Sequence, residues 1–323
     1  MKATSLAHLG VSWIVAACAA VAILLLSVAW LRPALSACKR VSASGIGAVA
    51  FYYGANVRAE QFESFDTVVL EPDSGFDPAA HLAHCPKWYA YVSVGEVSKA
   101  RAYYAKMPHT WLLAADDARD AMHDSARDSM HDSAVVDQTA PGWPAFFVDE
   151  IIEPLWERGY RGFFLDTLDS YRRVAQTDAA RAKQQAGLVA VLHALKARYP
   201  QAQLILNRGF EILPQVHDQV AAVAFESLFG RWDRTNQRYG AVPDRDREWL
   251  LGEAREVHER YQLPVISIDY CAPGDDACRE DIVRKIGALG IVPYVTDGGL
   301  QTIGVSRAVI KDAEPLISVT LKG

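Results

Sequence analysis

Residues 162–171 of this 323-residue chain read Gly-Phe-Phe-Leu-Asp-Thr-Leu-Asp-Ser-Tyr, a short apolar run that ends in two carboxylates, Asp166 and Asp169. A continuous apolar run of this length is typical of a parallel strand that helices cover on both faces. An unpaired charge is costly to bury, so Asp166 marks the end of the strand and not its core. In α/β folds the carboxyl ends of the strands carry the chemistry. The stretch therefore predicts a strand that delivers carboxylates to a functional site.

Seven further segments have the same strand-like character, and they lie at residues 49–54, 67–72, 88–96, 204–209, 222–229, 265–271 and 291–297. Helical patterns separate most of them, for example at 148–158, 178–199, 245–261 and 281–288. Eight alternations predict an α/β protein with a (β/α)8 TIM barrel over residues 49–323, after a small-residue linker at 41–48. A doubly wound sheet is the alternative, but it usually has fewer strands and often a Gly-rich phosphate loop, and neither GxGxxG nor GxxxxGK[ST] occurs.

The composition is that of a globular protein, with 50% hydrophobic and 22% charged residues. The formal net charge is −6 and the sequence shows no basic stripe, so we do not expect nucleic-acid binding. An acidic balance is compatible with a cationic substrate.

The N-terminal residues 11–31 contain no charge and are long enough to span a bilayer. Within residues 1–40 three interpretations stay open: an uncleaved signal anchor, a cleaved secretory signal, or a lipoprotein signal with Cys38 as the lipidated residue. Each of them exports the rest of the chain, so we expect a membrane-anchored, periplasmic or extracellular protein of a bacterium. A buried core helix is the remaining alternative.

Export makes disulfides possible. Cys271 and Cys278 enclose a turn-rich loop after a predicted strand, and a bridge between them would pin that loop. Cys85 is then expected to be a buried thiol. No C-x-x-C pair is present, which argues against a zinc ribbon.

An eight-residue tandem repeat occupies 119–126 and 127–134, with seven of eight positions identical. Such a copy is tolerated in an exposed loop, where extra length costs little entropy. The repeat by itself explains the spacing of His123 and His131, so no metal is needed to account for it.

Carboxylates stand at six of the eight predicted strand ends, and no histidine does. That pattern argues against a mononuclear zinc site and against a His-based nucleophilic triad. It suits glycoside hydrolysis, in which one carboxyl group protonates the leaving oxygen and another acts as nucleophile or base. Asp166 and Glu226 form the best pair, because each directly follows apolar residues that raise a carboxyl pKa. The alternative is that one or both close salt bridges with Arg161, Arg208 or Arg231.

The other polar and aromatic residues at strand ends are candidates for substrate binding: Tyr52, Tyr53, Glu96, Asp169, Asn207, Arg208, Asp269, Tyr270 and Asp297. Sugar rings stack on aromatic faces, and amino-sugar cations are attracted to them. Tyr171, Phe229 and Trp232 extend this aromatic rim. For the carboxylates in this set, the alternative role is structural, which is to hold neighbouring residues in place. Glu71, which precedes Pro72, is expected to shape a loop.

The motifs FYYG, VVLEP, YVSVGE, GFFLDTLDSY, LNRGFEILP, FESLF and VPYVTDGGLQ, spread over residues 48–305, resemble the glycoside hydrolase family 114 and 166 group. The resemblance implies a (β/α)8 barrel that cleaves α-1,4-linked galactosamine or N-acetylgalactosamine exopolysaccharide internally, without a metal or other cofactor. It implies that Asp166 and Glu226 match the catalytic carboxylates. Because the chain ends soon after the eighth strand, we expect a stand-alone hydrolase. We also expect it to be monomeric.

Analogy with retaining α-galactosidases on similar barrels makes Asp166 the nucleophile and Glu226 the acid/base. Fold-level analogy is a weak warrant, and the sequence leaves retention and inversion open. Two other classes of function also stay open: a non-catalytic sugar-binding barrel, and a metal-dependent polysaccharide hydrolase or deacetylase.

Overall fold

The computed structural model describes residues 46–81, 84, 86–113 and 133–307. A nine-stranded sheet forms its centre, and every neighbouring pair is parallel except the last, β13 with β14. The strands in sheet order are β1 (Val49–Tyr52), β2 (Thr67–Leu70), β3 (Lys87–Ser93), β7 (Gly162–Asp166), β8 (Gln203–Asn207), β9 (Ala222–Glu226), β12 (Val265–Tyr270), β13 (Val292–Thr296) and β14 (Val305–Ser306). The eight parallel strands coincide with the eight predicted segments, which confirms them, although each ends a little earlier than predicted.

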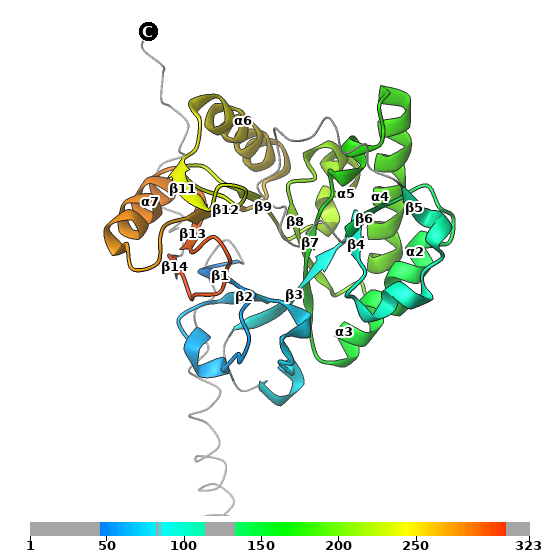
Figure 1. Cartoon of the computed structure of the whole chain (residues 1–323), viewed down its shortest axis with the longest axis horizontal. Coiled ribbons are helices and arrows are strands. Elements are labelled where there is room, and N and C mark those ends of the chain that lie inside the picture. The colour runs from blue at the N-terminus through cyan, green and yellow to red at the C-terminus, as the bar shows by residue number, and fades with distance from the viewer. Residues whose placement is uncertain (1–45, 82–83, 85, 114–132, 308–323) are drawn as a thin grey trace, which may run out of the picture. The chain divides into compact units, whose positions relative to one another are not determined.

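The two ends of this sheet approach each other. Strand β14 pairs with β13, and its Ser306 Oγ accepts the Val49 N–H of β1 at 3.1 Å. The Tyr294 hydroxyl on β13 also donates to the Phe51 carbonyl on β1 at 2.9 Å. The sheet is therefore a nearly closed, barrel-like ring with helices outside it, consistent with a TIM barrel (Figure 1).

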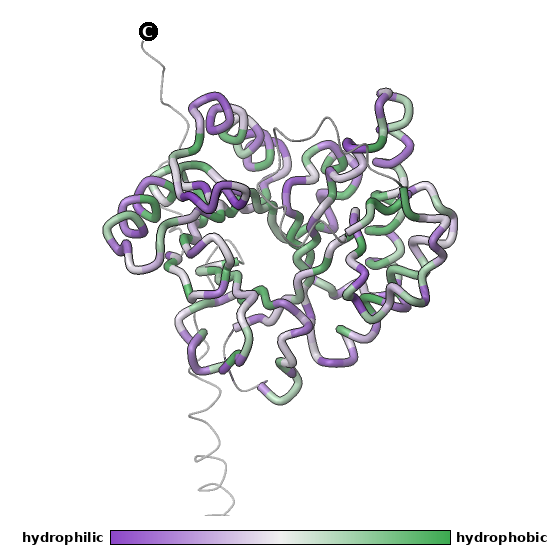
Figure 2. The backbone as a smooth tube through the Cα atoms, in the orientation of Figure 1, coloured by the Kyte–Doolittle hydropathy of each residue, from purple (hydrophilic) through white to green (hydrophobic). Residues whose placement is uncertain are grey.

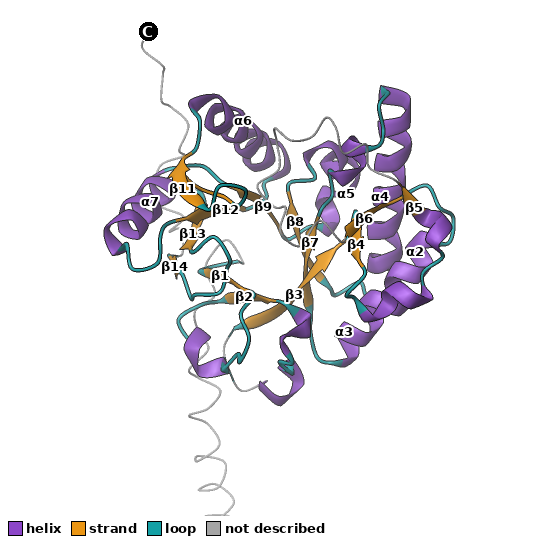
Figure 3. Cartoon of the chain, in the orientation of Figure 1, coloured by secondary structure: helices purple, strands orange, loops and turns teal. Residues whose placement is uncertain are grey.

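Helices cover most of the outside of this ring, as Figure 3 shows. The α-helices are α2 (Trp143–Phe146), α3 (Glu153–Glu157), α4 (Asp178–Arg198), α5 (Leu213–Val216), α6 (Asp244–Tyr261) and α7 (Asp276–Ala288), with the π-helical turn η7 (Phe147–Ile152) joining α2 to α3. N-terminal capping explains where two of these helices begin. The Thr177 side chain accepts the Ala180 N–H at the start of α4, and the Asp275 side chain accepts the Cys278 N–H at the start of α7. Between β1, β2 and β3 the described chain forms only short 3₁₀ turns.

Two small additions project from the ring. Strands β4 (Glu96–Ser98), β6 (Ser133–Val136) and β5 (Leu112–Leu113) form an antiparallel sheet after β3. Strands β10 (Gly230–Asp233) and β11 (Arg238–Ala241) form a hairpin directly after β9. The sequence pattern did not predict either addition.

The core has two layers, because each strand buries both faces. Phe51 and Phe164 meet inside the ring, with ring centroids 4.8 Å apart, and both are fully buried. Outside the ring, α4 contributes a buried stripe that includes Leu188, Leu192 and Leu195. In Figure 2 green, hydrophobic segments gather around the central ring, while the outer helices alternate between hydrophobic and hydrophilic residues. The near-continuous apolar sequence of the strands follows from this double burial.

Cys271 and Cys278 form a disulfide, as predicted, with a Cα–Cα distance of 6.1 Å. It ties the end of β12 to the first turn of α7. No helix in the described ranges is long and apolar enough to cross a membrane. The predicted anchor at 11–31, Cys38, Cys85 and the two histidines of the tandem repeat lie outside the described residues.

Replacing both Cys271 and Cys278 with alanine should lower the free energy of unfolding by about 2 kcal/mol, because the open chain regains the entropy of a short loop. Urea unfolding followed by circular dichroism measures this difference. The wild-type chain in reductant is the matched control and should behave like the double variant. Equal unfolding midpoints for the oxidised wild-type chain and the double variant would contradict the expectation.

Candidate active site

The register of the parallel strands decides which side chains share the inside of the ring. Ser93 pairs with Asp166, and Asn207 pairs with Ala224 two residues before Glu226. Leu165 pairs with Leu206, so Asp166 stands beside Asn207. Partners in a parallel sheet point to the same face, and residues two apart do so as well. Asp166, Asn207 and Glu226 therefore point the same way at the carboxyl end of the ring.

Asp166 ends β7 and is held by hydrogen-bond donors from both neighbouring strands. The Tyr91 hydroxyl donates to its Oδ2 at 2.9 Å, and Asn207 Nδ2 donates to its Oδ1 at 2.7 Å. Burial raises the pKa of Asp166, although these donors and the Thr167 amide act in the opposite direction. The carboxyl group is thus fixed in orientation and titrates above the usual range for aspartate.

Glu226 ends β9 and has one tyrosine partner. The Tyr270 hydroxyl donates to its Oε2 at 2.5 Å. Burial raises the pKa of Glu226, and the nearby charge of Asp166 raises it further, while the Tyr270 hydrogen bond lowers it. When two neighbouring carboxyl groups disfavour each other's ionisation, their pKa values move apart, so that one group can act as an acid and the other as a base.

Tyr53 lies near both carboxyl groups, since the charge of each acts on its hydroxyl. Its ring centroid is 5.1 Å from that of Tyr91. Burial raises the pKa of Tyr53, and Tyr91, Asp166 and Glu226 raise it further. Its neighbour Tyr52 packs on Phe62 instead, with ring centroids 5.5 Å apart. Of the two predicted tyrosines, Tyr53 therefore lies near the carboxyl pair, whereas Tyr52 packs against Phe62.

The alternative role of Asp166 and Glu226, salt bridges to Arg161, Arg208 or Arg231, is not found in the described part of the chain. Arg161 donates to the Trp156 and Tyr160 carbonyls, and Arg208 donates to the main-chain carbonyl of Glu226 at 3.1 Å. Neither catalytic candidate has an ion pair to an arginine among the described residues.

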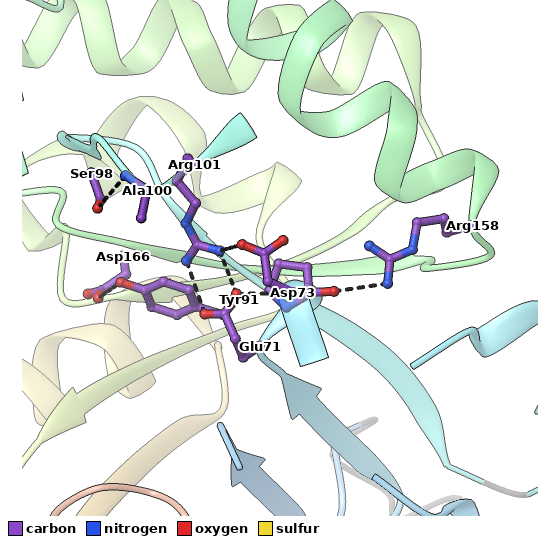
Figure 4. Close-up of polar contacts among 9 residues, drawn as sticks. Glu71, Asp73, Tyr91, Ser98, Ala100, Arg101, Arg158 and Asp166 are labelled. Carbon is purple, nitrogen blue, oxygen red and sulfur yellow. Dashed lines mark hydrogen bonds and ion pairs between the residues drawn. The ribbon is translucent and has the colours of Figure 1, made fainter. Parts of the chain in front are cut away.

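Behind Tyr91 lies a second charged cluster, drawn in Figure 4. Arg101 pairs with Glu71 at 2.5 Å and with Asp73 at 2.7 Å, while the Tyr91 ring reaches towards Asp166. A cavity of about 250 Å³ opens beside this cluster, between β3 and the helices η7 and α3. Glu71 also caps the turn that follows β2, by accepting the Asp73 N–H, and this fits its predicted loop-shaping role.

The residue after Asp166 has an unusual backbone. Thr167 has φ +62°, a left-handed conformation that is rare for a β-branched residue. Its hydroxyl accepts the Gly95 N–H at 2.9 Å and lies 2.8 Å from Ser93 Oγ. A Cβ atom on Gly95 would lie 1.9 Å from the Thr167 carbonyl oxygen. The turn after β3 therefore locks the backbone next to Asp166.

Three predicted substrate-binding carboxylates, Glu96, Asp269 and Asp297, bind the chain's own groups. Asp269 is fully buried and accepts the N–H groups of residues 228–230 at 3.2, 2.6 and 2.8 Å. Glu96 pairs with Arg173 at 2.7 Å. Asp297 accepts the Gly299 N–H at 2.8 Å and the Thr302 N–H at 2.6 Å.

The rim above the carboxyl pair combines charge and aromatic rings. Asp169 is 41% exposed and lies 3.6 Å from Arg208. The Trp232 and Tyr239 rings of the hairpin pack at a tilt of 41° with centroids 4.4 Å apart, and the Tyr239 hydroxyl accepts the Gly298 N–H at 3.1 Å. Tyr171, by contrast, is 2% exposed and belongs to the core.

Comparison with known proteins identifies the family of this chain. The model of glycoside-hydrolase family GH114 matches residues 40–311. The chain belongs to glycoside-hydrolase family GH114. It is therefore a glycoside hydrolase by family, in line with the resemblance drawn from its motifs.

Among solved structures, the glycoside hydrolase domain of PelA from Pseudomonas aeruginosa matches with a TM-score of 0.70 and 32% identity, over 80% of this chain and 98% of that one. Aspergillus fumigatus Ega3, solved in complex with galactosamine, matches with a TM-score of 0.56 and 13% identity, over 83% and 98%, a likeness of fold alone. An uncharacterized protein of Deinococcus radiodurans is 24% identical over 300 residues, 84% of each chain.

No group of three or more His, Cys, Asp or Glu side chains suited to a metal occurs in this GH114 chain within 46–81, 84, 86–113 and 133–307. Sequence reasoning missed Tyr91 and Thr167. Tyr91 lies two residues before the end of β3, and only the strand register brings it beside Asp166. The unusual backbone of Thr167 leaves no mark in the sequence.

Asp269→Asn should lower the free energy of unfolding by about 1–3 kcal/mol, because asparagine keeps one acceptor oxygen and its NH2 group faces some of the N–H groups of residues 228–230 instead. Hydrogen exchange should speed up at those amides, and urea unfolding measures the loss. Asp276→Asn, an exposed carboxylate at the start of α7, is the matched control. Unchanged exchange at residues 228–230 would show that Asp269 does not hold this loop.

Proposed function

We propose that this GH114 protein is an endo-acting hydrolase of α-1,4-linked galactosamine or N-acetylgalactosamine exopolysaccharide, with Asp166 and Glu226 as its catalytic pair and a (β/α)8 barrel as its scaffold. The observation that carries the proposal is the pair itself. Two partly buried carboxyl groups with raised pKa share one mouth, and each is oriented by a tyrosine hydroxyl. The 32% identity to the PelA hydrolase domain supports the proposal, and the galactosamine complex of Ega3 suggests the sugar.

In the proposed mechanism Glu226 is the general acid, because its raised pKa keeps the proton available. Asp166, held by two donors, is the charged group and attacks the anomeric carbon while Glu226 protonates the leaving oxygen. The glycosidic bond breaks and an ester to Asp166 forms. Glu226 then takes a proton from water, which hydrolyses the ester and restores both groups. Proton NMR of the first-formed product tests this retaining course, and the opposite anomer would assign an inverting one.

The remaining candidates receive roles under the same proposal. Tyr53, Asn207, Tyr270, Asp169 and Arg208 line the path of the sugar chain next to the pair. We assign Glu96, Asp269 and Asp297 to holding the loops of the mouth, since their oxygens already bind the chain's own donors. We also propose that the domain acts outside the cytoplasm as a monomer, with residues 1–40 as its export or anchor segment.

Asp166→Asn and Glu226→Gln should each lower polymer cleavage by roughly 10²–10⁴-fold, because each removes a group that carries charge or a proton in the transition state. Mass spectrometry of defined galactosamine and N-acetylgalactosamine oligomers, with reducing-end release, measures the loss. Asp178→Asn, on the exposed first turn of α4, is the matched control, and chelator should leave activity unchanged. Full activity of both variants would reject the pair, and binding without cleavage by the wild-type chain would indicate a sugar-binding barrel.

Tyr270→Phe and Tyr91→Phe should move opposite limbs of the pH profile of kcat/KM. Loss of the Tyr270 donor raises the pKa of Glu226, which must be protonated, so the alkaline limb moves to higher pH. Loss of the Tyr91 donor raises the pKa of Asp166, which must be charged, so the acidic limb also moves to higher pH. Tyr104→Phe, on a ring that packs on His109, should move neither limb. A shift of either limb to lower pH would contradict the assigned roles.

A further inference from the structure

Trp249 on α6 is 47% exposed, and no other large apolar side chain in the described part of the chain is exposed to this degree. Its indole is nevertheless held in place. Trp249 Nε1 donates to Glu253 Oε1 at 3.0 Å, and the Phe210 ring stands perpendicular to it with centroids 6.0 Å apart. The Arg208 guanidinium lies 5.7 Å from the indole centroid. We call Trp249, Phe210 and Arg208 the Trp249 platform.

The platform is connected to the carboxyl pair through Arg208. This side chain donates to the main-chain carbonyl of Glu226 at 3.1 Å and lies 3.6 Å from Asp169. Arg208 itself follows β8 in the left-handed conformation, with φ +58°, which directs the chain from the strand end to Phe210. The indole therefore lies at the edge of the mouth, on the side of the strand that carries Glu226.

The platform has a carboxylate at its edge, because Glu253 accepts the indole N–H of Trp249. The cation Arg208 lies beside Asp169, and Arg172 pairs with Glu211. Burial raises the pKa of Glu253, and the hydrogen bond from Trp249 opposes this effect. Its neighbour Glu256 pairs with Arg260 at 2.9 Å, so Glu253 is the carboxylate that we assign to the platform. A sugar that carries an ammonium group would find both an aromatic face and negative charge there.

We infer that the Trp249 platform is a subsite that stacks one pyranose ring of the polymer, away from the scissile bond, with an amino-sugar cation directed to Glu253. The inference rests on the proposed function and adds a binding site on α6 to it. The apolar C–H face of a pyranose covers exposed indole surface, and the hydrogen bond to Glu253 leaves the ring already oriented for that contact. Binding at such a remote position holds the chain in line with the carboxyl pair.

The test combines affinity and cleavage. Trp249→Ala should weaken binding of long galactosamine oligomers to the Glu226→Gln chain by about five- to tenfold in calorimetry, the usual size of one aromatic contact. KM for the polymer should rise by about the same factor in the otherwise wild-type chain. Trp249→Phe, which keeps an aromatic face, should restore most of the affinity. Binding of oligomers too short to reach the platform should not change.

Arg255→Ala, an exposed change on the same helix, is the matched control, and circular dichroism melts confirm that each variant is folded. Equal affinity of Trp249→Ala and the control for long oligomers would overturn the subsite. A wild-type chain that binds oligomers in a Trp249-dependent way but cleaves none would keep the subsite and reject the hydrolase. A wild-type chain that binds none would reject the subsite.

Discussion

The two-residue period of the parallel strands is the constraint on which the site depends. It places Asp166, Asn207 and Glu226 on one side of the ring and separates residues that are neighbours in sequence. Tyr270 reaches Glu226, whereas Asp269, one position earlier, points away and binds the loop at residues 228–230. The same alternation separates Tyr53 from Tyr52. Which side chains face this mouth is therefore decided by strand parity as much as by residue type.

Burial gives the carboxyl pair its electrostatic character. Both side chains follow apolar residues directly, and loss of solvation raises the pKa of each. Hydrogen-bond donors oppose this effect unequally: among the described residues, Tyr91 and Asn207 donate to the Asp166 carboxyl group and Tyr270 donates to that of Glu226. An acid and a base can thus arise from two similar groups, because the protein solvates one of them better than the other.

The sequence was sufficient for the eight parallel strands and for the Cys271–Cys278 bridge, because long apolar runs and a short turn-rich loop carry local signals. It did not separate the carboxylates that face the mouth from those that bind backbone, since that depends on register and on the following loop. Tyr91 was missed for the same reason. The hairpin of β10 and β11 was missed as well, because its alternation is short and mostly polar.

Glu96, Asp269 and Asp297 have one effect in common: each attaches a loop of the mouth to a carboxylate that is itself well buried. A loop that is already ordered in the free protein loses little conformational entropy when a ligand arrives. A long, flexible sugar chain must lose much of its own freedom on binding, so a rigid receptor keeps the total entropy loss small. Under the proposed function, the three buried carboxylates act on affinity without touching the polymer, because they keep the loops around it rigid.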